Sequence, residues 1–256
     1  MKIKSLFSSS DGNACLVVTD EESILIDAGV SWKQIQGTGG EALDKLTAIF
    51  VSHEHSDHVL GAGIAARKSG ATIYIPKASH EKRAELFKNT KIVYINGGDV
   101  IDLKSLSIKA FSTRHDSIES VGFVITDKSN QTAFGYLTDT GSISLVIRES
   151  LKNCDALLIE ADYDPQLLED YDEYDPLLKD RIKCPYGHLG NDQAVDFINS
   201  LKLDSIQWVL FGHMSRQTNS RDAINTIISH KIKEEYWAKF KFAPNTEFLE
   251  IQCITH

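Results

Sequence analysis

Short apolar segments separated by Gly, Asp and Ser clusters dominate the first third of the chain, and many of their residues are β-branched. This pattern is typical of strands joined by turns. It predicts strands over 2–7, 14–19, 23–29 and 46–52. Later apolar runs predict further strands over 71–76, 91–95, 105–113, 154–162, 205–211 and 246–252, with a hairpin over 120–141.

Helical periodicity lies between these strands. Apolar residues spaced three and four apart predict helices over 59–69, 78–88, 143–152, 191–201 and 220–232. The acidic stretch 162–180 is expected to be an irregular or short helical insert. This order of elements fits two sheets with helices outside them, so the expected fold class is mixed α/β. No Gly/Ser/Pro-rich linker interrupts residues 1–256, which we expect to form a single domain.

The composition is ordinary for a globular protein, with 42% hydrophobic and 25% charged residues. No apolar run approaches the ~18 residues that a membrane span needs, and the start of the chain does not resemble a signal peptide, so no membrane association is expected. The four cysteines are far apart in sequence, which fits a cytoplasmic protein. The net charge of −9 means that any surface for nucleic acid would have to be a local patch.

The stretch HEHSDH, residues 53–58, holds three of the nine histidines of the chain. Imidazoles this close repel one another when charged and pack poorly when neutral, whereas metal binding is their common use. Residues two apart in an extended segment share a face, so His53 and His55 can bind one metal ion together. The chain then turns into a helix, and Asp57 and His58 face a second position nearby. Three isolated histidines are interpreted as surface or core residues: His80, His230 and His256.

A two-metal site needs further ligands, and three candidates follow predicted strands, where the catalytic loops of layered α/β proteins lie. His115 follows the strand 105–113, Asp139 follows the hairpin, and His213 follows the strand 205–211. A carboxylate such as Asp139 can bridge two ions. Two metal ions ~3.5–4 Å apart can share a hydroxide and clamp the attacking and leaving oxygens of a hydrolysis. The residues therefore indicate a dinuclear metallohydrolase.

HEHSDH resembles the HxHxDH signature of the metallo-β-lactamase superfamily, and the other candidates follow in that family's order. Within the superfamily the chain is most similar to the YycJ/WalJ-type subgroup. The segments that carry this similarity are SSSDGNACLV, HEHSDH, STRHDSIESVGF, LTDTG, LLIEAD, GHLGNDQA and GHMSRQTN. The resemblance spans nearly the whole chain. It implies an αβ/βα four-layer sandwich with a dinuclear site at one edge.

The resemblance also implies how the ligands divide between the two ions. The first metal would be held by His53, His55 and His115. The second would be held by Asp57, His58 and His213, with Asp139 bridging. Asp27, in ILIDAG, would support the ligands from behind rather than bind metal.

The type of hydrolysis rests on fewer residues. Asp57 is a hard carboxylate where many true β-lactamases have a cysteine, and hard ions suit phosphate oxygens. In tRNase Z-like relatives a comparable histidine lies beside the scissile phosphate and pairs with a glutamate, and by motif these are His188 and Glu160. His188 would act as general acid and Glu160 would orient it. We expect His188, Glu160 and the metal-binding Asp57 to be catalytic.

Two alternatives stay open for His188. It is a surface residue in a helix cap, or it replaces His213 as a ligand of the second metal. We prefer His213 as the ligand because it directly follows a buried strand.

Substrate contacts are predicted in two polar loops. Asn13, in SSSDGN, is expected to approach the site or the substrate phosphate. Ser215, Arg216 and Asn219, beside His213, are expected to contact phosphate, for which an arginine fork is well shaped. The competing interpretations are a hairpin turn and a helix start. The acidic stretch EADYDPQLLEDYDEYDP would repel a polyanion if it faced the site.

These observations predict a hydrolase with two divalent metal ions, zinc or manganese, that acts on a phosphodiester, with nucleic acid among the candidate substrates. A small-molecule phosphodiesterase is the nearest alternative and is favoured by the acidic pI of about 5.5. A metal-binding regulatory module with little turnover is the alternative from another class. The sequence leaves the oligomeric state, the strandedness of the substrate and the cleavage polarity open.

Overall fold

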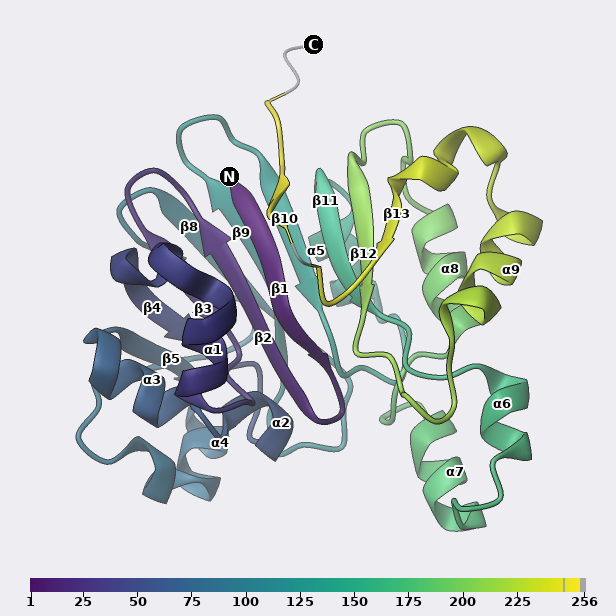
Figure 1. Cartoon of the computed structure of the whole chain (residues 1–256), viewed down its shortest axis with the longest axis horizontal. Coiled ribbons are helices and arrows are strands. Elements are labelled where there is room, and N and C mark those ends of the chain that lie inside the picture. Colours follow the sequence, from purple (N-terminus) through teal and green to yellow (C-terminus); the bar gives the residue numbers. More distant parts are fainter. Residues whose placement is uncertain (246, 254–256) are drawn as a thin grey trace.

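Two seven-stranded sheets pack face to face in the computed structural model, which describes residues 1–245 and 247–253. Helices cover the outer face of each sheet (Figure 1). The predicted αβ/βα four-layer sandwich is therefore confirmed. None of the helices in these two ranges is long and apolar enough to cross a membrane.

Each sheet joins an antiparallel part to a parallel part. In order, the first sheet contains β14 (Leu249–Glu250), β1 (Lys2–Ser9), β2 (Gly12–Val18), β3 (Ser23–Ile26), β4 (Leu46–Phe50), β5 (Thr72–Pro76) and β6 (Ile92–Ile95). The second contains β13 (Phe240–Phe242), β12 (Trp208–Gly212), β11 (Ala156–Glu160), β10 (Ala133–Leu137), β9 (Val121–Asp127), β8 (Leu106–Ser112) and β7 (Val100–Asp102). Strands β3 to β6 are parallel, as are β10 to β13.

The main core lies between the sheets, and a further apolar layer lies outside each of them. Strand β4 shows why its sequence is apolar throughout: Phe50 faces the other sheet, whereas Ile49 faces the helices. Phe50 stacks on Tyr74, with 4.7 Å between ring centroids, and meets Phe123 of the opposite sheet edge-on at 5.6 Å. The sheets are thus fixed relative to each other beside the residues that follow β4.

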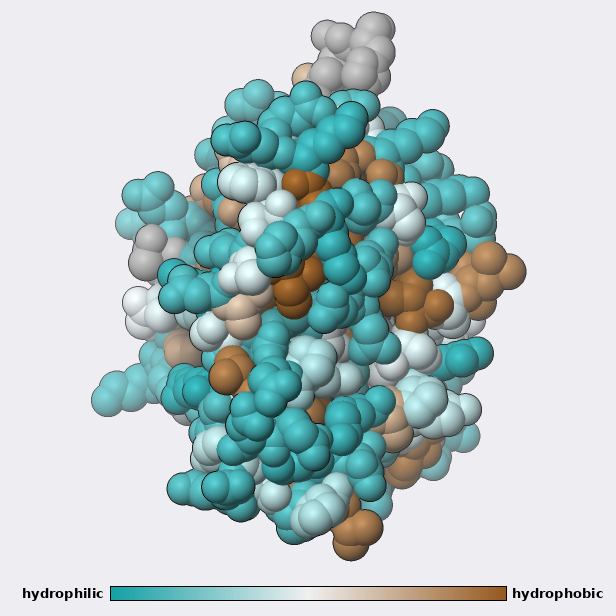
Figure 2. Space-filling model, turned by 90° about the vertical axis from the view of Figure 1, so that its right-hand side faces the viewer, coloured by the Kyte–Doolittle hydropathy of each residue, from teal (hydrophilic) through white to brown (hydrophobic). Residues whose placement is uncertain are grey.

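The helices divide between the two outer faces. They are α1 (Trp32–Gly39), α2 (Ser56–Val59), α3 (Ala62–Ser69), α4 (Lys77–Lys82), α5 (Leu145–Leu151), α6 (Pro165–Asp170), α7 (Pro176–Lys183), α8 (Asn191–Asn199) and α9 (Arg221–Lys231). Short 3-10 helices span Gly40–Lys45, Ala84–Phe87 and Glu234–Lys239. Figure 2 shows the side formed by the later helices, where hydrophilic residues dominate and hydrophobic ones are scattered.

Most predicted elements are present, with differences in two helices, in the last strand and in elements that were not predicted. The predicted helix 59–69 is broken into α2 and α3 at Gly61, where a Cβ atom would lie 2.0 Å from the carbonyl oxygen of Val30, so the chain passes too close for a side chain. The predicted helix 78–88 is α4 followed by a 3-10 turn. The acidic stretch 162–180 is a short helical insert as expected, with α6 and most of α7 inside it.

The other differences concern the ends of the chain and unpredicted elements. The predicted strand 246–252 is reduced to β14, with residue 246 outside the described residues, as is His256. The unpredicted helix α1 starts with a capping box between Ser31 and Gln34, a signal present in the sequence as SWKQ. Strands β7 and β13 are only three residues long, which is too short for a periodic pattern.

Candidate metal centre

The predicted ligands all lie at one edge of the sandwich, the lower edge in Figure 1, where α2, α4 and α7 also lie. The HEHSDH stretch follows β4, and His115 follows β8. Asp139 and His213 follow β10 and β12. These four strands end at the same edge, so residues far apart in sequence meet there.

Backbone strain is concentrated at this edge. Asp27, Asp139 and His213 each have a positive φ, at 58°, 56° and 49°. Only two further non-glycine residues with positive φ occur in the described part of the chain. Such a conformation costs of order 1–3 kcal/mol and persists where surrounding structure imposes it, often at functional sites. Each of the three lies one or two residues after a strand, and its side chain contacts a predicted metal ligand of the centre.

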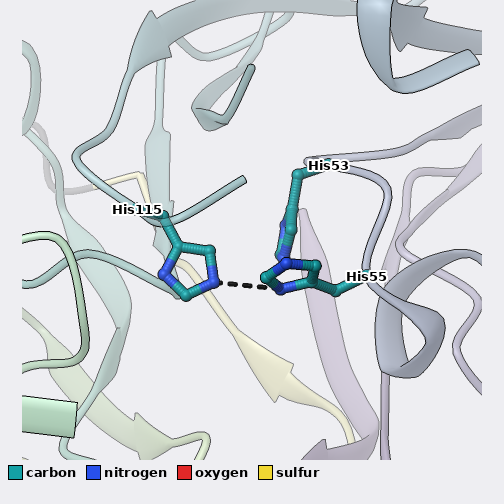
Figure 3. A group of neighbouring side chains, drawn as sticks. All are labelled: His53, His55 and His115. Atoms are coloured by element: carbon teal, nitrogen blue, oxygen red, sulfur yellow. Dashed lines mark hydrogen bonds between the residues drawn. The ribbon is translucent and has the colours of Figure 1, made fainter. Parts of the chain in front are cut away.

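Three histidines form the first cluster. His53 and His55 come from the loop after β4, and His115 approaches from the opposite sheet (Figure 3). The distance between His115 Nε2 and His55 Nδ1 is 3.1 Å. The three rings point toward one another, with ring centroids 4.6 to 5.0 Å apart. The structure therefore brings together the residues predicted for the first metal.

The second cluster contains Asp57, His58 and His213. The Oδ2 atom of Asp57 lies 3.1 Å from His58 Nε2 and 3.4 Å from His213 Nε2. Gly29 allows this arrangement, because a Cβ atom there would lie 1.6 Å from the carbonyl oxygen of Asp57. The loop after β3 is thus packed directly against the first turn of α2.

Asp139 lies between the two clusters. Its Oδ2 is 3.0 Å from His58 Nε2, and its Oδ1 is 3.5 Å from His213 Nε2 and 3.6 Å from His115 Nε2. A single carboxylate therefore reaches both predicted ligand groups, which is the position that a bridging ligand needs.

The electrostatics of the centre separate charged carboxylates from a neutral imidazole. Burial alone would raise the pKa of Asp139, but the charges of His213 and His58 outweigh it and hold that pKa well below its usual range. For His213, burial alone would lower the pKa, but the charge of Asp139 outweighs it and raises that pKa to about 9. Burial and the charge of His58 lower the pKa of His53, which stays neutral with a free lone pair.

The donor set fits divalent metal ions. Within each cluster the nitrogen and oxygen donors lie within 4.8 Å of one another. His53 Nε2 is buried and has no hydrogen-bond partner among the described residues, and the buried carboxylate of Asp139 groups with it. A buried polar atom without a partner is costly, and a metal ion bound between His53 and Asp139 would satisfy it.

Asp27 lies behind the ligands, as the resemblance implies. Its Oδ2 lies 2.8 Å from His58 Nδ1 and accepts hydrogen bonds from the hydroxyls of Ser52 and Tyr136, both at 3.0 Å. Its Oδ1 accepts the backbone N–H of Ser52 at 2.8 Å. Asp27 thus directs His58 Nε2 toward the centre. The roles of Ser52 and Tyr136 have no motif in the sequence, because they depend on contacts between the two sheets.

Asn13 approaches the predicted ligands. Its Nδ2 lies 3.0 Å from His58 Nε2 and donates to Asp57 Oδ2 at 3.2 Å. Asn13 is buried. It follows the β1–β2 turn and contacts the second cluster from that side. Of the two predicted alternatives, site or substrate, the structure places it at the site.

His188 and Glu160 form a pair beside Asp139. His188 Nδ1 is 3.3 Å from Glu160 Oε2 and 3.7 Å from Asp139 Oδ1. Glu160 also accepts the backbone N–H groups of Asp139 at 2.5 Å and Leu189 at 2.6 Å, so its position is fixed. Burial opposes protonation of His188, but the charge and hydrogen bond of Glu160 raise its pKa to about 10. The imidazole therefore carries a proton that Glu160 holds in place.

The predicted contacts after His213 have other partners. Ser215 is buried and accepts the backbone N–H groups of Gln217 and Thr218, so it stabilises a turn. Arg216 is exposed and pairs with Asp11 at 2.8 Å. Asn219 is engaged within the protein too, and its contact with phosphate stays a prediction.

Asn219 has its whole amide engaged. Its Nδ2 donates to the carbonyl of Ala161 at 2.7 Å and to Asn191 Oδ1 at 2.8 Å, and its Oδ1 accepts from Asn191 and Ser220. Both bonds from Nδ2 are thus made to groups of the protein itself. The amide instead joins the start of α8 to the turn after β12.

Glu54 has a role that the sequence does not indicate. It lies between His53 and His55, so in an extended segment its side chain points away from theirs. Its side chain is buried, and it accepts the Ser79 hydroxyl at 2.8 Å and the backbone N–H of Ile118 at 2.9 Å. Ile118 belongs to the loop that carries His115. Glu54 therefore ties the HEHSDH stretch to the ligand loop of the other sheet.

Comparison with known proteins agrees with this geometry. The family model described as "Beta-lactamase superfamily domain" matches residues 22–214. The chain belongs to this superfamily. It is 30% identical to the Streptococcus pneumoniae protein named exodeoxyribonuclease WalJ, over 91% of this chain and 88% of that one. It is 27% identical to the Bacillus anthracis protein named exodeoxyribonuclease YycJ, over 90% and 88%.

A solved structure shows the same fold. The metallo-β-lactamase fold protein YhfI from Bacillus subtilis superposes with a TM-score of 0.75 at 18% identity, covering 97% of this chain and 99% of that one. Superfamily membership confirms the predicted metal-dependent hydrolase, and nuclease or phosphodiesterase chemistry is consistent with the curated relatives. The superfamily and the His/Asp clusters imply divalent metal ions.

Proposed function

We propose that this protein is a two-metal exodeoxyribonuclease, with DNA phosphodiesters as its substrate. The observation that carries the proposal is the position of Asp139, which reaches both predicted ligand clusters and also the protonated His188. Similarity to two exodeoxyribonucleases over nine tenths of the chain supports DNA as the substrate.

We assign the predicted ligands to two ions in the proposed centre. One ion would be held by His53, His55 and His115, the other by Asp57, His58 and His213, with Asp139 shared. When bound, the ions would activate a water molecule and neutralise charge on the phosphate. We propose zinc as the metal, because five imidazoles dominate the donor set, with manganese as the alternative.

His213 rather than His188 is the proposed ligand. His213 groups with Asp57 and His58, whereas His188 groups with Glu160, Asp139 and His213 and is hydrogen-bonded to Glu160. Its side chain is also 21% exposed, against 2% for His213, so it can meet a substrate.

His188 is the proposed general acid. Glu160 accepts a hydrogen bond from Nδ1–H of His188. The proton on Nε2 is then available for the leaving oxygen of the scissile phosphodiester. After transfer, the neutral imidazole would regain a proton from solvent through its exposed edge. Glu160 is a positioning residue, because it acts on the reaction only through His188 and the backbone at Asp139.

Two further assignments complete the proposal. We propose a cytoplasmic location, which the absence of disulfides among Cys15, Cys154, Cys184 and Cys253 in the described residues supports. We also propose that residues 1–256 function as one domain, since the core between the sheets contains residues from Met1 to Ile251.

Turnover of a panel of phosphodiesters tests the proposal. Purified protein loaded with zinc or manganese should release mononucleotides from DNA and should also hydrolyse bis-p-nitrophenyl phosphate. Metal analysis should give about two ions per chain, the number that the shared Asp139 requires. Hydrolysis of the small diester without any cleavage of DNA would contradict the nuclease proposal and indicate a small-molecule phosphodiesterase. Tight metal binding with no turnover of any substrate in the panel would indicate the other alternative, a metal-binding regulatory module.

A further inference from the structure

A pocket of about 530 Å³ opens beside the metal centre, and we call it the α4–α7 pocket. Its lining includes two predicted metal ligands, His55 and Asp57. A molecule in this pocket therefore touches the residues that face the reacting phosphate. The volume lies in the range typical of pockets for small organic ligands, which is enough for part of a nucleotide.

Three cationic side chains line the pocket. Lys82 and Arg83 come from the end of α4, and Arg181 comes from α7. The two helices lie at the same edge of the molecule in Figure 1. The net charge of −9 requires any surface for a polyanion to be local. The same lining holds three carboxylates, Glu54, Asp57 and Asp116, of which Asp57 is a proposed metal ligand, so the cations can serve a phosphate where these acids are engaged elsewhere.

The acidic groups near these cations are largely occupied. Asp116 lies 2.5 Å from Arg181 Nε and 3.4 Å from His115 Nε2, so it faces the metal centre and one arginine. Glu54 is buried and accepts hydrogen bonds from the protein behind the pocket. Glu85 is exposed and lies 3.8 Å from Arg83 Nε, beyond hydrogen-bond distance.

Polar atoms in the pocket lack partners. Arg83 donates from Nη2 to Ser56 Oγ at 3.1 Å, but its Nε has no partner among the described residues. The hydroxyl of Ser117, which also lines the pocket, is buried and has no partner within the same ranges. Buried polar groups are normally paired, so unpaired donors beside a cationic pocket indicate an absent acceptor.

We propose that the α4–α7 pocket binds the phosphate adjacent to the scissile one in a DNA strand, through Lys82, Arg83 and Arg181. The inference rests on the proposed nuclease function and assigns the substrate strand to this side of the centre. Guanidinium groups match the oxygen geometry of phosphate, and the Ser117 hydroxyl supplies a further donor. The exposed Arg216–Asp11 pair, which does not line this pocket, is then outside the path of the strand.

Two substrates separate this pocket from the chemistry of the centre. Oligodeoxythymidylate has a phosphate next to the scissile one, whereas bis-p-nitrophenyl phosphate has none. Loss of one charged hydrogen bond should raise KM for the oligonucleotide by about tenfold or more in Arg83→Gln and Arg181→Gln. Lys82→Gln should raise it less, because an ammonium group does not make the two parallel bonds to phosphate that a guanidinium can. Hydrolysis of bis-p-nitrophenyl phosphate should stay at the wild-type rate, which also shows that the variants are folded.

The salt dependence of oligonucleotide KM gives a second readout. Each lost phosphate contact should reduce the slope of log KM against log salt by about 0.7. Lys77→Gln is the matched control, since Lys77 lies on the same helix, pairs with Glu81 and does not line the pocket. It should behave as wild type on both substrates.

The outcomes distinguish the pocket from the proposed function. If the wild type cleaves DNA and the three pocket variants keep its KM and salt slope, the pocket assignment is overturned while the nuclease stands. The same holds if Arg216→Gln, rather than Arg83→Gln, raises KM. An equal loss on both substrates would also overturn it, because the arginines would then act on the centre. If the wild type hydrolyses only the small diester, the nuclease proposal itself fails.

Discussion

The two halves of the metal centre are built in different ways. The first half has four predicted ligands from one continuous stretch, 53–58, which runs from the loop after β4 into α2. The second half supplies His115, Asp139 and His213, each from the end of a different strand. Geometry in the first half follows from local alternation and one helical turn, whereas geometry in the second half depends on the register of a whole sheet.

This difference indicates where the centre is vulnerable. Side chains in the first half are held by their own backbone, but residues that contact both sheets join this half to the second. Asp139 contacts His58, Asp27 binds Tyr136, and Glu54 binds the loop that carries His115. Substitution of such joining residues should therefore show how far each half of the centre works without the other.

Asp139→Ala should have the largest effect, because it removes the one carboxylate that reaches both clusters. Removing a general acid typically lowers the rate by about 10²–10⁴-fold, and we expect kcat/KM of Asp139→Ala to fall further than that. Metal content should drop below that of the wild type, measured by atomic emission on the purified variant. Full metal content with near wild-type turnover would contradict a shared role for Asp139.

His188→Gln should rank next and should depend on the leaving group. A poor leaving group such as a nucleotide oxygen needs a proton, so DNA cleavage should fall about 10²–10⁴-fold. p-Nitrophenolate leaves without protonation, so hydrolysis of bis-p-nitrophenyl phosphate should change little. An equal loss on both substrates, together with reduced metal content, would make His188 a ligand instead of an acid.

Asp27→Asn should weaken the centre without removing a ligand. The amide cannot hold His58, Ser52 and Tyr136 as the carboxylate does, and loss of such support typically costs 10–100-fold in metal affinity or activity. Competition with a chelator measures the affinity. Tyr136→Phe removes only one of these bonds and should lie between the wild type and Asp27→Asn, whereas unchanged affinity in Asp27→Asn would contradict the supporting role.

Metal affinity should also rise with pH. In the metal-free protein Asp139 raises the pKa of His213 to about 9, so the imidazole is protonated at neutral pH and must lose that proton to bind metal. Affinity should therefore increase by up to about tenfold per pH unit for each proton released, and should level off above pH 9. The raised pKa stabilises the metal-free fold below the unfolded pKa, and this contribution is lost as the pH rises through about 9.

Calorimetric titration with metal in buffers of different ionisation enthalpy counts the protons released. A heat that is independent of the buffer at neutral pH would contradict a protonated His213. His58, in the first half, should release a proton as well, because Asp139, Asp57 and Asp27 raise its pKa against the effect of burial, whereas His53 is already neutral.

The sequence predicts the first half of the centre better than the second for a physical reason. Ligands in 53–58 are close in sequence, so alternation alone indicates that they share a site. Asp139 and His213 are recognisable only as polar residues after apolar strands. Asn219 fits the same description, yet its amide is used to join α8 to a turn. Position after a strand does not distinguish a ligand from a structural residue.

Long-range contacts explain the remaining differences. The bond from Tyr136 to Asp27 joins residues 109 apart in sequence, and no local pattern predicts it. Arg83 and Arg181 line one pocket only because α4 and α7 lie at the same edge. The fold is easier to predict from the sequence than the site. Strands and helices bury one face, and the spacing of hydrophobic residues shows which face that is.

Glu54→Gln should have the smallest effect and is the most direct probe of the junction between the halves. The amide oxygen can replace one of two accepted hydrogen bonds, from Ser79 or Ile118, so the free energy of unfolding should fall by about 1 kcal/mol. Ser56→Ala, at the exposed spacer of the same stretch, should stay within about 0.5 kcal/mol of the wild type. If Glu54→Gln also lowers metal affinity and Ser56→Ala does not, the His115 loop is held at the centre by Glu54. A loss of stability without any loss of metal affinity would show that the two sheets alone position His115.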